Sequence, residues 1–538
     1  MKKLLSLFLT ICASSVFVTQ IASCNKRPSA VFGDDNPLKI GLEIDRKNAI
    51  KDKDIDQNSY GVTNYYILGD SLSDVDGLTT YMGTKLSISN LKINFKFDGD
   101  FSWNFDNVDE FSKLKPTTFQ NKIIKKAGEE ESDNEDNNDT PNNEGTSTDL
   151  RSSFSNGPTA SFLLGRRMFN VKDMKPSNIM MKKPTYKGEY GTTYAVGGAT
   201  ASHTGSSMST LLEDAAIDNQ AKALISQHKF GSKAVVAMSI GGNDVFNMIS
   251  TYNPYGASEK TTQIMDEAIE KIRYTVFSLL NNGIKNILLI TSPSMDKVPK
   301  NASRFYKTYD PNSEDENKSK CYDAYGKLYD DPNYEGSICY SNGDSEESED
   351  EDNPITAGIP IRKKTNETIF IEATTKEFNR RIENIVKEVH SYYPNGLRTF
   401  DLFNKFDSIN EQSKFTIKYE NYINNVGLAV WAEGNPKPDY DPIGSFSLNS
   451  DTLKKIVSKI AEAAKDVNSS SSTNRQINVQ LNFWGDPRPG YPADVNSYFF
   501  DDNIHPTKIV HSDVEQMLEK EIKELFDKNK NEGIGDSK

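Results

Sequence analysis

The sequence predicts an α/β fold in which helices cover both faces of a mostly parallel sheet. Two continuous apolar runs, Ala234 to Ile240 and Ile287 to Thr291, have the length and composition of strands buried on both sides. A helical segment from about Thr261 to Asn281 lies between them, and Asn282-Gly283 ends it. Strands that alternate with helices in this way are typical of parallel sheets.

The first strand of the sheet is expected just before residue 69. The apolar run Tyr65 to Leu68 stops at Gly69-Asp70-Ser71, a composition that favours a sharp turn. The later elements, in order, are a turn at Ser155-Asn156-Gly157-Pro158 with a helix to about Arg167, a short strand from Thr192 to Val196, a helix from about Leu211 to His228, a helix from Thr375 to Val389 and a strand from Leu397 to Asp401. The aromatic residues between positions 79 and 124, Phe95 and Phe101 among them, follow no clean period, and we expect them to pack in the core.

The length and composition favour one large domain with solvated insertions. Of 538 residues only 36% are hydrophobic, and we expect the domain to span residues 59–527. Insertions near residues 125–150, 308–353 and 468–473 have acidic, Asn-rich or Ser-rich compositions typical of disorder. An EF-hand over Asp133 to Glu144 is a poor match, because Asn138 takes the glycine position and Pro141 falls inside the loop.

The start of the chain is typical of an export signal over residues 1–23. Lys2-Lys3 precedes an apolar stretch that is too short for a membrane span, and small residues stand directly before Cys24. This arrangement resembles the lipobox of bacterial lipoproteins, which implies cleavage before Cys24 and lipidation of its thiol. The alternative is a plain signal peptide with an incidental cysteine. Residues 24–58 are polar and suit a tether, so we expect an enzyme held by lipid at the outer face of the bacterial cell membrane.

The remaining cysteines and the charge restrict the partners. In an exported protein Cys321 and Cys339 are either a disulfide pair or two free thiols, and neither has the spacing of a metal ligand. The formal net charge of -14 argues against a nucleic-acid partner, because no basic stripe offsets repulsion from phosphates.

Ser71 is the candidate nucleophile, because the end of a parallel strand presents its side chain at the ligand-binding edge of the sheet. A serine hydroxyl needs a base, and His505 in Asp501-Asp502-Asn503-Ile504-His505-Pro506 is the best candidate, since Pro506 stiffens its loop and Asp502 can curl back to Nδ1. The other four histidines, His203, His228, His390 and His511, have polar or helical settings, and we expect them at the surface.

Two glycine-rich turns supply candidate donors for a developing oxyanion. At Gly197-Gly198 the missing Cβ allows a backbone N–H to approach a ligand atom closely. At Asn243 a side-chain amide offers a second N–H. Each of these segments taken alone has the composition of an ordinary turn.

Four segments together resemble the SGNH hydrolase superfamily, specifically its GDSL esterase and lipase branch. They stand in the order that the family has: Gly-Asp-Ser-Leu at 69–72, Tyr-Ala-Val-Gly-Gly-Ala at 194–199, Gly-Gly-Asn-Asp at 241–244 and Asp-Asn-Ile-His-Pro at 502–506. The resemblance covers most of residues 60–515 and leaves out the tether and the insertions. It implies a flavodoxin-like three-layer α/β/α core and ester hydrolysis through an acyl-enzyme, with no metal or organic cofactor.

By position, the resemblance implies Ser71 as nucleophile, His505 as general base and Asp502 as its orienting partner. It also implies that Gly198 and Asn243 donate to the oxyanion together with the backbone N–H of Ser71. Gly197 is the alternative to Gly198, and Asp501 is the alternative to Asp502. Lipid tethering favours acyl esters of lipids or phospholipids as substrates. A surface glycan O-deacetylase and an inactive adhesin lipoprotein with a hydrolase fold are the alternatives.

Overall fold

The computed structural model describes residues 36–55, 58–88, 91–105, 149–205, 211–253, 258–302, 306–309, 361–364, 366–412, 417–443, 450–467, 475–487 and 490–531. The expected export signal, Cys24, Cys321 and Cys339 lie outside these residues, as do the three expected insertions apart from residues 149, 150, 308 and 309. No helix in the described ranges is long and apolar enough to cross a membrane.

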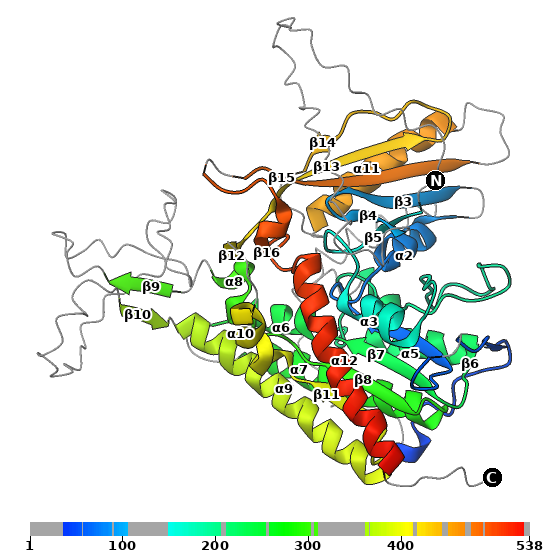
Figure 1. The fold of residues 1–538 in the computed structure, drawn as a ribbon. Coiled ribbons are helices and arrows are strands. Elements are labelled where there is room, and N and C mark those ends of the chain that lie inside the picture. The colour runs from blue at the N-terminus through cyan, green and yellow to red at the C-terminus, as the bar shows by residue number, and fades with distance from the viewer. Residues whose placement is uncertain are drawn as a thin grey trace, which may run out of the picture.

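A parallel sheet of four strands forms the centre of the fold (Figure 1). Its order is β11 (Leu397–Phe400), β8 (Asn286–Ile290), β7 (Ala234–Ser239) and β2 (Asn64–Gly69), and every neighbouring pair runs parallel. All residues of β2, β7 and β8 are buried, as expected for continuous apolar strands between two helix layers. The predicted α/β fold with a mostly parallel sheet is confirmed.

Alternate residues of each strand contribute to two separate cores. Tyr66 and Leu68 face the core formed with α5 (Ile217–Gln227), α7 (Glu259–Asn281) and α9 (Asn366–Tyr392). Tyr65 and Ile67 face the core formed with α3 (Ala160–Phe169), α10 (Leu402–Gln412) and α12 (Lys508–Asn531). Since successive side chains of a strand point to opposite faces, these two cores define an α/β/α sandwich.

A second sheet, which the sequence analysis did not predict, lies above one end of the first in Figure 1. Its order is β14 (Asp441–Pro442), β13 (Ile423–Ala432), β15 (Gln476–Gly485) and β3 (Lys92–Gly99), with α11 (Ser450–Val467) packed on β13 and β15. In β3 the buried residues Ile93, Phe95 and Phe97 alternate with more exposed ones. The expectation that the aromatic residues of this region pack in the core is therefore correct, but they do follow a period of two.

The remaining elements are short or support the loops. They are η2 (Pro37–Lys39), β1 (Ile50–Lys51), α2 (Gly77–Leu86), β4 (Ser102–Asn104), β5 (Leu150–Ser152), η5 (Glu213–Ala215), β6 (His228–Lys229), α6 (Gly242–Ile249), η6 (Met295–Lys297), α8 (Pro299–Ala302), β9 (Tyr306–Tyr309), β10 (Ile361–Lys364), β12 (Ile417–Asn421), η7 (Val495–Ser497) and β16 (Tyr498–Phe500). The strand expected from Thr192 to Val196 is reduced to isolated bridges, of which one joins Thr193 to Ile67.

Residues 36–55 correct the expected extent of the tether. They pack on the domain: β1 pairs with β6, the Asn281 side chain donates to the carbonyl of Pro37 at 2.8 Å, and Arg46 donates to the carbonyl of His228 at 3.0 Å. The segment also buries Ile40 in the core, but many of its contacts with the domain are hydrogen bonds of polar groups. A composition argument does not distinguish such a segment from a solvated linker.

Candidate active site

The turn after β2 holds Ser71 in a shape that requires glycine at position 69. Gly69 has φ +141°, and a Cβ there would lie 2.2 Å from the carbonyl oxygen of Ser239 on β7. The Asp70 carboxyl accepts from the N–H of Leu72 at 3.1 Å and tightens the turn. Burial raises the pKa of Asp70 to about 7, although the Leu72 N–H and His505 oppose the shift. The result is a rigid turn with Ser71 at the carboxyl edge of the sheet.

The structure brings Ser71, His505 and Asp502 into one hydrogen-bonded chain across 434 positions of sequence. The Nε2 of His505 lies 2.7 Å from the Oγ of Ser71, and its Nδ1 lies 2.7 Å from the Oδ2 of Asp502. This is the order of contacts that a serine, a base and an orienting acid need.

Asp502 is held in the orientation that meets His505. Its Oδ1 accepts from the backbone N–H groups of Ile504 at 2.8 Å and His505 at 2.6 Å. Burial opposes the charge on this carboxyl, but the positive field and the hydrogen bonds of His505 outweigh burial, so the pKa of Asp502 is lowered. An ionised Asp502 fixes the tautomer in which Nδ1 carries the proton and Nε2 accepts from Ser71.

Asp501, the alternative acid, has a different environment. It is fully buried, and neither carboxyl oxygen accepts a hydrogen bond of good geometry within the described residues. Burial, with smaller contributions from Asp100 and Asp502, raises the pKa of Asp501 well above its usual range, although the Asn156 N–H and the Lys508 charge favour ionisation. The geometry therefore places Asp502, rather than Asp501, behind the imidazole.

The His505 loop is braced by residues that the sequence analysis did not assign to the site. The Phe154 ring lies 4.9 Å from the imidazole centroid, and the Phe101 ring lies 6.4 Å from it. The hydroxyl of Ser155 donates to the carbonyl of Pro506 at 3.0 Å, and Asn156 Oδ1 accepts from the N–H of Lys508, the first residue of α12. The Ser-Asn-Gly-Pro turn at 155–158 is the sequence feature that could have indicated these contacts, but a turn motif does not show which distant segment it contacts.

The two glycines of the loop at Gly197-Gly198, called the glycine loop below, differ in how their N–H groups are used. The N–H of Gly197 donates to Asp74 Oδ2 at 2.6 Å, so it is already used. Gly198 has φ +82°, and within the described residues no hydrogen bond uses its N–H or that of Ser71. The Asn243 amide donates to the carbonyl of Ala199 at 2.9 Å, which uses one of its two N–H bonds. Ser71, Gly198 and Asn243 thus retain free donors at the same edge of the sheet.

Two buried aspartates position this loop, and both were missed as site residues. Asp74 accepts from the N–H groups of Gly77 and Leu78 as well as Gly197, and so ties the nucleophile turn to the glycine loop. Asp244 accepts from the N–H groups of Ala201 at 2.9 Å and Ser202 at 2.7 Å.

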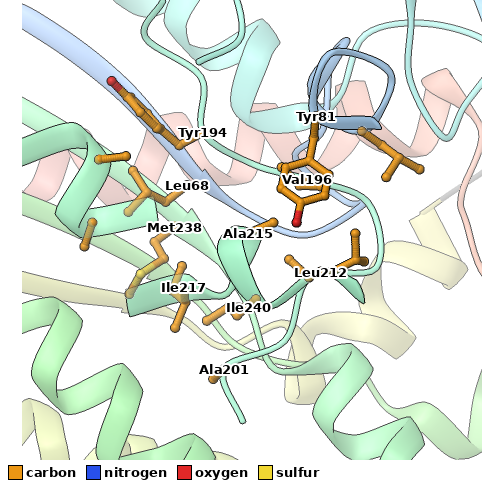
Figure 2. Close-up of a cluster of buried hydrophobic side chains, with 14 of the residues drawn as sticks. Leu68, Tyr81, Tyr194, Val196, Ala201, Leu212, Ala215, Ile217, Met238 and Ile240 are labelled. Carbon is orange, nitrogen blue, oxygen red and sulfur yellow. The ribbon is translucent and has the colours of Figure 1, made fainter. Parts of the chain in front are cut away.

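Burial raises the pKa of Asp74 and that of Asp244 to about 7, against the effect of these N–H donors. On either side of the two glycines, Val196 and Ala201 pack in the apolar cluster that contains Leu212 (Figure 2).

The expectation of surface histidines is wrong for His228 and His511. His228 is buried, with Nδ1 2.6 Å from Asp52 Oδ1 and Nε2 2.8 Å from the hydroxyl of Tyr194. His511 is buried on α12, where Nδ1 accepts from the N–H of Ala160. Burial lowers the pKa of His511 to about 3. A polar sequence context does not predict exposure when the ring nitrogens find buried partners. His203 and His390 are partly exposed.

Comparison of the chain with protein-family models and with curated proteins gives no match. The geometry itself defines the chemistry available: a serine hydroxyl next to a base that an acid orients, with three free N–H donors at the same edge of the sheet. Such a group can attack a carbonyl carbon and hold the negative charge that develops on its oxygen.

Proposed function

We propose that this chain is a serine ester hydrolase of the SGNH type, which cleaves acyl esters through an acyl-enzyme intermediate. The single observation that carries the proposal is the hydrogen-bonded chain from Ser71 Oγ through His505 to Asp502. The four segments that resemble the GDSL branch support it, as do the free donors of Ser71, Gly198 and Asn243.

In the first step His505 Nε2 takes the proton of Ser71 while Oγ attacks the ester carbonyl carbon. The carbonyl oxygen becomes an oxyanion that the N–H groups of Ser71, Gly198 and Asn243 stabilise, and Asp502 stabilises the imidazolium. His505 then gives its proton to the departing alcohol oxygen as the bond from carbon to that oxygen breaks. The acyl group stays on Ser71.

In the second step water takes the place of the alcohol. His505 removes a proton from the water, the hydroxide attacks the acyl carbon, and the same donors hold the second oxyanion. The bond from the carbon to Ser71 Oγ breaks, His505 returns the proton to Oγ, and a carboxylic acid is released. Lipid attachment at Cys24 and a location at the outer membrane face belong to this proposal as predictions that fall outside the described residues.

A serine-reactive alkyl phosphonate tests the proposal directly. We expect stoichiometric labelling of the wild-type protein, with the modified peptide containing Ser71, and no labelling of Ser71→Ala. Ser73→Ala is the matched control, because Ser73 is buried two residues away and its Oγ lies 3.1 Å from Ser161 Oγ. Labelling that persists in Ser71→Ala, or that disappears in Ser73→Ala alone, would contradict the assignment.

A further inference from the structure

An apolar cavity begins at Ser71 and continues into the domain. Together with the open solvent at its mouth, it encloses about 860 Å³ of space. Ser71 and Asn243 line one part of it, and the rest is mainly aliphatic and aromatic. Six of its lining residues are Ile290, Leu402, Phe406, Ile409, Val510 and Val514.

The order of the strands gives the cavity its direction and length. The residues that follow β2, β7, β8 and β11 all line it: Ser71, Asn243, Pro293 and Leu402. It therefore crosses three strand-to-strand steps along the carboxyl edge, a path of roughly 14 Å at about 4.8 Å per step. An extended carbon chain advances about 1.2 Å per bond, so the path suits a chain of roughly ten to twelve carbons.

The part of the cavity lined by Ile290 and by residues of α10 is buried and apolar. Ile290, Phe406 and Ile409 are at most 6% exposed, and Phe406 packs against the rings of Phe499 and Phe500. Within the part of the chain that the structure describes, the residues lining the cavity include no lysine or arginine. A phosphate headgroup would find no cationic partner beside Ile290, Phe406 and Ile409, whereas a hydrocarbon chain gains from burial.

The two halves of an ester differ in what they need from such a cavity. The alcohol must leave after the first step, and water must reach the same side of the acyl carbon, next to His505 Nε2. The acyl chain stays attached to Ser71 through both steps. A buried apolar cavity that starts at Ser71 therefore suits the acyl chain, and the alcohol side must remain open to solvent.

We propose that this cavity, referred to below as the acyl cavity, binds the acyl chain of the substrate, and that Leu402, Phe406 and Ile409 on α10 set the chain length. The inference rests on the proposed esterase function. It narrows the substrate to esters of medium-chain carboxylic acids and disfavours acetyl esters of glycans.

The first test is a series of p-nitrophenyl esters from acetate to palmitate. Each methylene buried in an apolar site is worth roughly fourfold, so kcat/KM is expected to rise by at least about 100-fold from butyrate to an optimum near decanoate or dodecanoate. Binding of the free acids to Ser71→Ala, measured by calorimetry, is expected to follow the same order without any chemistry.

Variants at the far end of the cavity test the role of α10. Ile409→Phe shortens the available path and is expected to move the optimum to shorter chains, and Ile409→Ala is expected to move it to longer ones. Leu402→Phe serves as the second filling variant if Ile409→Phe proves unstable. Ile369→Phe is the control, because it makes the same change on α9 at a position that is 52% exposed, away from the cavity, and the wild-type optimum should persist.

The outcomes separate the inference from the proposed function. Hydrolysis with a preference for acetate, or with an optimum that none of the α10 variants moves, would overturn the acyl cavity and leave the esterase. Binding of dodecanoate to Ser71→Ala together with no hydrolysis of any ester by the wild type would overturn the esterase and support the cavity as a site for acyl chains. Neither binding nor hydrolysis would overturn both.

Discussion

Asp501 and Asp502 are neighbours in sequence, but the same substitution is expected to abolish most of the activity at Asp502 and to change it little at Asp501. Asp502→Asn keeps the size of the side chain and an oxygen for the N–H groups of Ile504 and His505. It places an NH₂ group where Oδ2 lies 2.7 Å from the Nδ1 of His505. That NH₂ cannot accept from Nδ1–H, so the imidazole adopts the tautomer with the proton on Nε2, which faces Ser71.

The loss can be estimated from the chemistry of this contact. A histidine with Nε2–H cannot take the serine proton, and an amide does not stabilise the imidazolium. Together these effects are worth about 10⁴-fold in kcat for a serine, histidine and aspartate arrangement, or roughly 5.4 kcal/mol of barrier. The assay is kcat on the p-nitrophenyl ester that the wild type prefers, with circular dichroism to confirm that the variant is folded.

Asp501→Asn is the matched control. Its carboxyl makes no contact with the imidazole, and its raised pKa means that a neutral side chain already suits the site. We expect kcat within a few-fold of the wild type. A loss of less than tenfold in Asp502→Asn, or an equal loss in both variants, would refute the assignment of the orienting acid.

Two further predictions concern the oxyanion donors and the pH dependence of folding. Asn243→Ala removes one side-chain donor and should lower kcat by about 10²- to 10³-fold with an unchanged circular dichroism spectrum, whereas an unfolded variant would make Asn243 a structural residue. The free energy of unfolding should fall as the pH rises from about 4 to 7. The pKa values of Asp74 and Asp244 in the folded state are about 7, above the usual value near 3.8. The folded state therefore binds more protons than the unfolded state in this window and loses stability as they dissociate. Urea denaturation at several pH values measures the slope of stability against pH. Asp501→Asn should make this slope shallower, because it removes another buried carboxyl with a raised pKa. A stability that rises over this window would contradict the burial argument.

The sequence predicted those parts of the molecule that depend on local chemistry. The apolar strands at 234–239 and 286–290 and the turn at Ser71 follow from composition and periodicity within a few residues. His505 and Asp502 were identifiable because the acid needs only a three-residue offset to reach Nδ1. Such features can be predicted without knowing which distant segments pack against them.

The features that were missed depend on contacts between distant segments. The choice between Gly197 and Gly198 needed Asp74, which lies 123 positions earlier and takes the N–H of Gly197. The burial of His228 needed Asp52, which the composition assigned to a tether. In each case a polar side chain has a partner in another segment, and a linear pattern contains no information about that partner.

The acyl cavity depends both on local sequence and on contacts between distant segments. The residues after each strand can be identified in the sequence, but only the structure shows that β2, β7, β8 and β11 are direct neighbours in that order. Only that order places Asn243, Pro293 and Leu402 in succession beyond Ser71 and turns four strand ends into one path. A different order of the same four strands would place these residues along a different path. The chain length of the substrate is thus a consequence of topology, and measuring it tests the order of the sheet as well as the chemistry at its edge.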